Sequence, residues 1–302
     1  LRGRRAEGEA MPRGATGATG AMPRQAPGLR AGSTDDNADL DVFRAYVAEW
    51  SGKPGVAGQV DTLDVSDART IRVSDSTGRP VPAARVSVID NATDRLVWTG
   101  KTYGDGTAPF YPHLRGGLLG ESAGAGEAGW SVQVAHGGTW TVAELPRQQD
   151  ELAVTLATEP TGPVQLDVVF LIDTTGSMGD EIERIKSTLL STTERLRDLD
   201  QDFDLQYGAV LYRDIGDDYV TKAHPLTGDI RRFDRALQGI QANGGGDGPE
   251  SLNQGLAVAV DHMDWRADAA KLVFLVADAP PHMDYQQDVS YGRSALAALH
   301  HG

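Results

Sequence analysis

The feature that most constrains the fold is LDVVFLIDTTGSM at residues 166–178, where an apolar run stops abruptly at carboxylate and hydroxyl side chains. The run from Val168 to Ile172 lacks the alternation of a half-exposed strand. It is typical of a parallel strand that is buried on both faces. Because such sheets bind ligands at the carboxyl ends of their strands, this stretch predicts an α/β sheet with a polar site at the end of one strand.

The polar cluster itself has the chemistry of a metal-binding loop. Asp173, Thr175 and Ser177 occupy alternate positions, and Gly176 between them permits a tight turn. Such a turn directs three side-chain oxygens to one point. Oxygen ligands suit hard cations such as Mg²⁺, Mn²⁺ or Ca²⁺.

Two later segments add oxygen-bearing side chains. The loop NGGGDGPES contains Asp247, Glu250 and Ser251, and the strand-like run KLVFLVAD ends in Asp278. Strand-like and helix-like patterns alternate through this half of the chain, which predicts a doubly wound, mostly parallel sheet. The spacing does not decide which of the three loop residues reaches a cation, nor whether Asp247 caps the following helix instead.

These three loops, in this order, resemble the metal-ion-dependent adhesion site of von Willebrand factor A domains, whose first loop reads Asp-x-Ser/Thr-x-Ser. The resemblance covers residues 163–302 and implies that one cation, Mg²⁺ or else Mn²⁺ or Ca²⁺, is held by Asp173, Thr175, Ser177, Asp247 and Asp278. It also implies an open coordination position for a carboxylate of a partner protein. The family's second loop usually supplies a threonine where this chain has Asp247, which makes the site more negative.

Several polar residues near these loops have two interpretations. Asp214 either accepts a hydrogen bond from a metal-bound water, or pairs with Arg213, or caps a turn. His282 either lines the rim of the site or is an ordinary loop histidine. Asp217 and Asp218 are expected to be solvated.

The first half of the chain divides into three parts. Residues 1–33 are rich in Gly, Ala, Pro and Arg and predict a disordered tail. Residues 34–62 contain an amphipathic helix, expected to pack on a neighbouring domain, and a linker. Residues 63–158 carry short strand-like runs separated by turn signals, which predicts an all-β, immunoglobulin-like antiparallel sandwich.

The sandwich region contains DSTGRPVPAARVSVID followed by YGDGTAPFYP. These phrases resemble the carboxypeptidase-regulatory or transthyretin-like modules of many bacterial surface proteins. The resemblance implies a spacer or an interaction module. No catalytic constellation is evident in this region.

Composition narrows the function. A net charge of −15 argues against nonspecific binding of nucleic acid, which needs Lys and Arg to neutralise phosphates. The absence of cysteine excludes disulfides, zinc–thiolate sites and thiol catalysis. No apolar run reaches the length of a membrane helix. The compartment stays open, with an extracytoplasmic setting favoured.

We therefore expect a cation-dependent protein-binding module and no enzyme activity. The first alternative is a magnesium-dependent hydrolase of the haloacid dehalogenase type. It needs a second acid where Thr175 stands, and a lysine at a strand end, whereas Lys271 begins a strand. The second alternative is a subunit that recruits a chelatase-like ATPase. No Gly-Lys-Ser/Thr phosphate loop occurs, so the ATPase would be a separate chain.

The end of the chain adds one expectation. The apolar run KLVFLVAD would lie at the sheet edge without a second partner strand, which natural proteins avoid. We therefore expect the sequence to be a fragment that is less stable and more prone to aggregate than a chain extended by about 60 to 80 residues.

Overall fold

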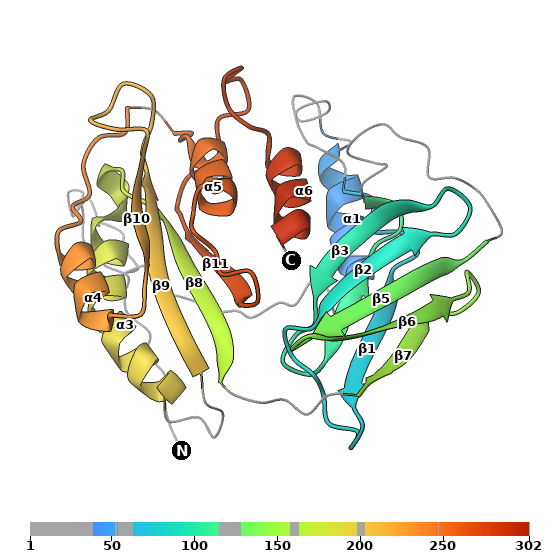
Figure 1. The fold of residues 1–302 in the computed structure, drawn as a ribbon. Helices are drawn as coiled ribbons and strands as arrows, with labels where there is room; N and C mark the ends of the chain where they lie inside the picture. The colour runs from blue at the N-terminus through green and yellow to red at the C-terminus, as the bar shows by residue number, and fades with distance from the viewer. Residues whose placement is uncertain are drawn as a thin grey trace, which may run out of the picture.

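A computed structural model describes residues 39–51, 53, 63–114, 128–157, 163–197, 203–246 and 248–301. Figure 1 shows an isolated helix, an all-β region and an α/β region in chain order. The predicted tail at residues 1–33 lies outside the described residues, as do most of the predicted linker and Asp247.

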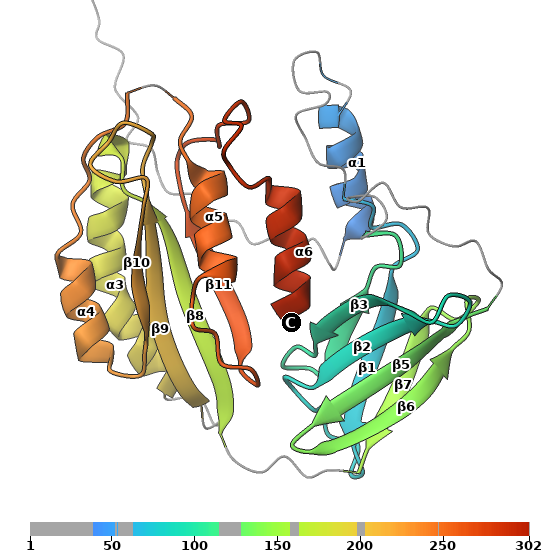
Figure 2. The same ribbon diagram turned by 45° about the horizontal axis from the view of Figure 1, so that its top comes forward.

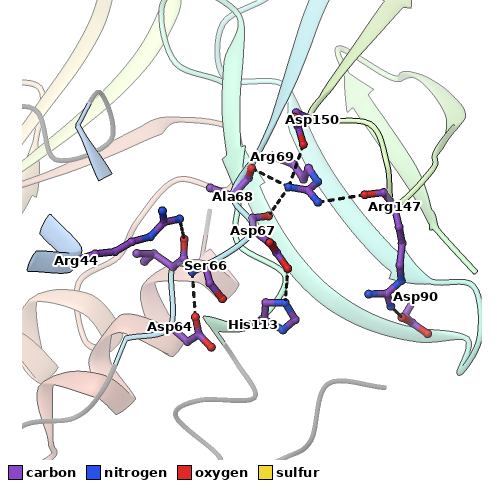
Figure 3. A network of polar contacts seen from close by, with 11 residues as sticks. Arg44, Asp64, Ser66, Asp67, Ala68, Arg69, Asp90, His113, Arg147 and Asp150 are labelled. Carbon is purple, nitrogen blue, oxygen red and sulfur yellow. Dashed lines mark hydrogen bonds and ion pairs between the residues drawn. The ribbon is translucent and has the colours of Figure 1, made fainter. Parts of the chain in front are cut away.

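The isolated helix α1 spans Leu40–Ser51, where the sequence predicts it. Its apolar residues Phe43 and Val47 are only half-buried, and Val42 and Tyr46 are exposed. Arg44 ties the helix to the all-β region by donating to the carbonyl oxygen of Val65 at 2.9 Å (Figure 3). The expected packing of this helix on a neighbouring domain is therefore slight.

The all-β region consists of two sheets around one core. Its strands are β1 Arg69–Asp75, β2 Arg85–Asp90, β3 Arg95–Lys101, β4 Thr107–Phe110, β5 Trp130–His136, β6 Thr139–Leu145 and β7 Glu151–Leu156. The sheet orders are β4-β1-β7 and β3-β2-β5-β6. The β1–β7 pair is parallel, which corrects the expectation of a wholly antiparallel arrangement. Strand β4 is short and contains Pro109, so its sequence gives little strand signal.

Aromatic and polar contacts hold the two sheets together. Phe110 contacts Trp98 and Trp130 edge to face, with ring centroids 6.0 and 5.2 Å apart. At one end, Arg69 donates to the carbonyl oxygen of Arg147, whose guanidinium pairs with the buried Asp90 at 3.3 Å (Figure 3). Because the carboxylate of Asp90 is buried, this ion pair fixes the end of β2 more firmly than a surface pair would.

The α/β region has one four-stranded sheet. Its elements are β8 Val164–Asp173, η1 Gly176–Met178, α3 Gly179–Arg197, β9 Phe203–Tyr212, β10 Thr221–Thr227, α4 Ile230–Gln238, α5 Leu252–Asp261, β11 Ala270–Val276 and α6 Tyr291–His301. The strand order is β10-β9-β8-β11. Strand β8 runs parallel to β9 and β11, and β10 is antiparallel to β9.

Strand β8 is buried on both faces, as its sequence predicts. Val168 and Ile172 belong to a core shared with α3 and α4, whereas Val169 and Leu171 belong to a core shared with α5. Figures 1 and 2 show α3 and α4 on one face of the sheet and α5 on the other. This layering confirms the prediction of a doubly wound sheet.

Strand β11 forms one edge of this sheet. Among the described residues it pairs with β8 alone, and Leu272, Val273, Phe274 and Leu275 are 38 to 51% exposed. The strand therefore has the exposed edge position that its sequence predicts. Helix α6 follows and contacts both α5 and β3, as Figures 1 and 2 show. Of the helices that the structure describes, none is long and apolar enough to cross a membrane.

Candidate metal centre

The predicted site lies where three parallel strands end. Because β8, β9 and β11 are parallel, their carboxyl ends share one edge of the sheet. Asp173 is the last residue of β8, Asp214 follows β9, and Asp278 follows β11. The fold thus brings together the loops that the sequence singles out.

Asp173 is the centre of the first loop. Its side chain is 0% exposed, and its Oδ1 accepts hydrogen bonds from the backbone N–H of Thr175 at 2.9 Å and from the Thr175 hydroxyl at 2.7 Å. Its Oδ2 is buried and has no hydrogen-bond partner among the described residues. A buried carboxylate oxygen without a partner costs free energy unless a cation or a proton satisfies it.

The surroundings of Asp173 make its ionised form unfavourable. Burial raises the pKa of Asp173, the hydrogen bonds from Thr175 oppose this shift, and the charge of Asp278 adds to it. Burial also raises the pKa of the neighbouring Tyr212, and the charge of Asp173 raises it further. Tyr212 therefore stays neutral beside Asp173, and a positive charge near Asp173 would stabilise its ionised form.

Glu250 is a second buried acid at this site. It is 3% exposed, and its Oε2 also lacks a hydrogen-bond partner among the described residues. Burial first, and then the charges of Asp173 and Asp214, raise the pKa of Glu250 to about 7. Its backbone joins the second loop to the third, because its N–H donates to Pro280 and its carbonyl oxygen accepts from His282.

A glycine-rich segment carries the second loop across the first. The Gly176 N–H donates to the carbonyl oxygen of Gly244 at 3.0 Å. Gly245 has a φ of +77°, and a Cβ there would lie 3.0 Å from Oε1 of Glu250 and 3.1 Å from Cβ of Thr175. Only glycine fits this left-handed and crowded position without strain. The close passage of Gly245 therefore allows Thr175 and Glu250 to approach each other.

Asp214 has partners that the sequence did not indicate. It accepts hydrogen bonds from the Ser251 hydroxyl at 3.1 Å and from the Tyr285 hydroxyl at 2.9 Å. Its predicted pairing with Arg213 is wrong, because Arg213 pairs with Asp218 at 3.4 Å. Asp214 therefore joins the start of α5 to the loop that follows β11.

Two other predictions about this region need correction. Asp217 is half-buried rather than fully solvated, and it accepts hydrogen bonds from the backbone N–H groups of Asp214 at 3.2 Å and Gly245 at 3.0 Å. His282 lies in the loop after β11, as predicted, but it is buried and has specific partners. Its ring stacks on Tyr285 at 3.9 Å, and its Nε2 lies 3.7 Å from Oδ2 of Asp214.

Of the five predicted metal ligands, the four that the structure describes differ in their burial. Asp173 and Thr175 are buried and bonded to each other, whereas Ser177 and Asp278 lie exposed on the adjoining loops. Asp247 is outside the described residues. Helix α5 has Ser251 as its N-cap, so this position gives no support to capping by Asp247.

The residues that the structure describes show which side chains could hold a cation. No three Asp, Glu, His or Cys side chains within the described ranges are arranged to hold a metal ion. The two buried oxygens without partners, on Asp173 and Glu250, nevertheless have the chemistry that a hard cation requires. The sequence indicated Glu250 as a candidate but not Tyr212. The signal that could have indicated Tyr212 is its position as an aromatic residue at the end of a buried strand.

Comparison with known proteins identifies the α/β region. Residues 167–290 match the family model of the von Willebrand factor A domain. This part of the chain is a von Willebrand factor A domain. Domains of this family mediate protein interactions.

Two relatives match a similar length of chain. The alpha-protein kinase vwkA of Dictyostelium discoideum is 34% identical over 121 residues, which are 39% of this chain and 19% of that protein. The putative ariadne-like RING finger protein R811 of Acanthamoeba polyphaga mimivirus is 30% identical over 122 residues, 39% of this chain and 11% of that protein. The chain thus spans less than a fifth of each relative. Neither relative is bacterial, so the bacterial source that the sandwich phrases imply stays a prediction.

A pilus adhesin, SpaC from Lactobacillus rhamnosus GG, is similar among solved structures. It has a TM-score of 0.32 and 14% identity, and the match covers 50% of this chain and 18% of that chain.

Proposed function

We propose that this chain is a divalent-cation-dependent protein-binding module. A cation held at the carboxyl ends of β8 and β11 would bind a carboxylate that a partner protein presents. The observation that carries the proposal is the pair of buried carboxylate oxygens, Asp173 Oδ2 and Glu250 Oε2, which have no hydrogen-bond partner among the described residues.

The ligand set follows from the loops. Asp173, Thr175, Ser177 and Asp278 are the residues that would hold the cation from the first and third loops. We propose Glu250 as the contribution of the second loop, because it faces Thr175 across Gly245, whereas the Ser251 hydroxyl is bonded to Asp214. The bound cation would supply a positive centre with an open position for the partner's carboxylate.

The hydrolase alternative is less well supported. Thr175 stands where that class needs a second acid, and here its hydroxyl donates to Asp173. Lys271 lies at the start of β11, where its ammonium donates to the carbonyl oxygens of Ala269 and His301. It is therefore at the opposite end of the strand from the site. Recruitment of a separate ATPase remains compatible with a binding module.

The kinase among the relatives does not alter the proposal. The match covers 19% of that protein, so the kinase activity in the relative's name does not carry over to this chain. We propose that this chain binds rather than catalyses, and that Mg²⁺ serves as its cofactor in an extracytoplasmic setting.

The open coordination position can be tested with Mn²⁺. Bound Mn²⁺ enhances the relaxation of water protons, and a ligand that displaces its water reduces that enhancement. We expect the enhancement to appear on adding Mn²⁺, and to fall when a short peptide with one glutamate is added. The matching peptide with glutamine should have no effect.

Two variants make this experiment decisive. Asp173→Asn should abolish the enhancement, while Asp264→Asn, which changes an exposed carboxylate outside the site, should leave it unchanged. Enhancement that persists in Asp173→Asn would contradict the site. Enhancement that is insensitive to the glutamate peptide would contradict the binding mode.

A further inference from the structure

A second unusual site lies where the von Willebrand factor A domain meets the all-β region. The Lys101 ammonium, at the end of β3, donates to the carbonyl oxygens of Ala267 at 2.7 Å and Ala269 at 2.6 Å. Helix α6 contacts both β3 and α5, so it lies between the two regions (Figures 1 and 2). These contacts create a shared boundary that the proposed metal centre does not use.

The boundary contains a half-open cavity of about 610 Å³. This volume is within the range of small-molecule sites, which is roughly 300 to 1,000 Å³. Its wall is mainly apolar and combines residues of both regions, among them Trp98, Tyr111, Leu114, Leu166, Phe203 and Leu299. The size and the wall suit an apolar molecule rather than a sugar or a nucleotide.

Two lysines interrupt this apolar wall. Lys101 is 9% exposed, and Lys271 is half-buried beside it. The Lys271 ammonium donates to the carbonyl oxygens of Ala269 at 3.3 Å and His301 at 3.0 Å. Within the described part of the chain, neither ammonium forms an ion pair. An ammonium has three N–H donors, so each lysine retains one donor beyond these two hydrogen bonds.

This arrangement is electrostatically unfavourable as it stands. Burial first, and then the neighbouring Lys271, lower the pKa of Lys101 to about 7. Arg85 adds to this shift and Asp268 partly offsets it. Two adjacent cations with few countercharges are unusual in a chain whose net charge is −15. Each cation disfavours the charged form of the other. An anion placed beside the two ammonium groups would favour their charged forms.

We propose that this cavity binds a small amphipathic monocarboxylate, with the carboxylate on Lys101 and Lys271 and the apolar chain against Trp98 and Leu299. The number of donors favours this class, because two remaining N–H groups match the two oxygens of a carboxylate. A phosphate would bring more charge and more acceptors than the apolar wall can satisfy. A medium-chain fatty acid has both the required headgroup and the required body.

The proposal can be tested by calorimetric titration of the full chain with decanoate below its micelle concentration. We expect saturable binding of one decanoate per chain. Decanol and decyltrimethylammonium should bind at least about tenfold more weakly, because they lack the charge-assisted hydrogen bonds. Equal binding of decanol would overturn the assignment of the headgroup.

Variants separate the two lysines from general charge. Lys271→Met and Lys101→Met should each weaken decanoate binding about tenfold or more, whereas Lys222→Met, on the exposed face of β10, should not. Lys271→Arg keeps a cation at the half-buried position and should retain most of the affinity, which keeps the test valid if Lys101→Met does not fold. Unchanged binding in folded Lys271→Met, or no saturable binding to the parent chain, would overturn the proposal.

Discussion

Single buried acids decide the behaviour of the candidate metal centre. Asp173 and Glu250 are both buried, and both have raised pKa values. Each has one carboxylate oxygen without a hydrogen-bond partner among the described residues. Without a cation each of them favours protonation. The metal-free domain should therefore lose stability as the pH rises and these acids ionise.

The first prediction concerns Glu250→Gln. The folded-state pKa of about 7 is above the ordinary value of 4.5, so the native state binds more protons than the unfolded state between these values. Stability of the metal-free parent is thus fully present below pH 4.5 and falls as the pH rises through 7. Glutamine has no such proton, so in EDTA the variant should melt above the parent at pH 8 and close to it at pH 4.5.

Thermal melts at these two pH values measure this difference. Added Mg²⁺ should raise the melting temperature of the parent at pH 8 more than that of the variant. If Glu250→Gln melts below the parent at pH 8 in EDTA, the acid has a structural partner that the geometry does not show.

The second prediction concerns a buried ion pair at the opposite end of β8. Asp167 is 0% exposed and accepts hydrogen bonds from Arg266 through Nε and through the backbone N–H, each at 2.8 Å. Removing one member of a buried pair leaves an uncompensated charge, so Asp167→Asn should lower the free energy of unfolding by roughly 3 kcal/mol.

Urea unfolding of this variant has an internal comparison. Asp204 also pairs with Arg266, at 2.6 Å, but it is about half exposed. Asp204→Asn should therefore cost no more than about 1 kcal/mol. Equal losses for the two variants would show that burial does not control the strength of this pair.

At the level of elements, β11 is the least protected part of the fold. It pairs with one strand among the described residues and exposes four consecutive apolar residues. Exposed apolar edges of this kind favour pairing between copies, and natural proteins often place lysine there to prevent it.

The third prediction is that Leu275→Lys reduces self-association. Leu275 is 51% exposed, so the substitution should change the free energy of unfolding by about 0.5 kcal/mol or less. Light scattering at increasing protein concentration measures the effect. Val42→Lys adds the same charge on α1, away from the sheet, and should not reduce association. The same improvement in both variants would assign the effect to net charge rather than to the edge.

Across the whole molecule, the periodicity of the sequence predicted the helices and strands better than it predicted which strands pair with each other. The uninterrupted apolar run of β8 indicated a parallel strand buried on both faces, and the alternation of patterns indicated a doubly wound sheet. The parallel β1–β7 pair was not predicted, because strand pairing depends on contacts between distant segments. The immunoglobulin-like assignment of the all-β region stays a prediction.

In the candidate site, too, local features could be predicted from the sequence, whereas contacts between distant segments could not. The spacing of Asp173 and Thr175 predicted a turn that brings their oxygens together, and the Thr175 hydroxyl donates to Asp173 at 2.7 Å. That these oxygens share a cation stays a prediction. The roles of Asp217 and Glu250 could not be predicted, because they depend on how Gly245 crosses the first loop. A glycine-rich segment has many accessible conformations, so its path is decided by the whole domain rather than by its own sequence.

The central claim is that Asp173 lies at a divalent-cation site of this domain. The most direct measurement is the melting temperature of the full chain at pH 8 during titration with Mg²⁺ after treatment with EDTA. A ligand that binds only the folded state stabilises it by about 2.7 kcal/mol at a hundredfold excess over its Kd, so the parent and Asp264→Asn should show a saturable rise. Asp173→Asn should remain folded and show no rise. An equal response of Asp173→Asn and the parent, or no response of the parent to Mg²⁺, Mn²⁺ or Ca²⁺, would contradict the claim.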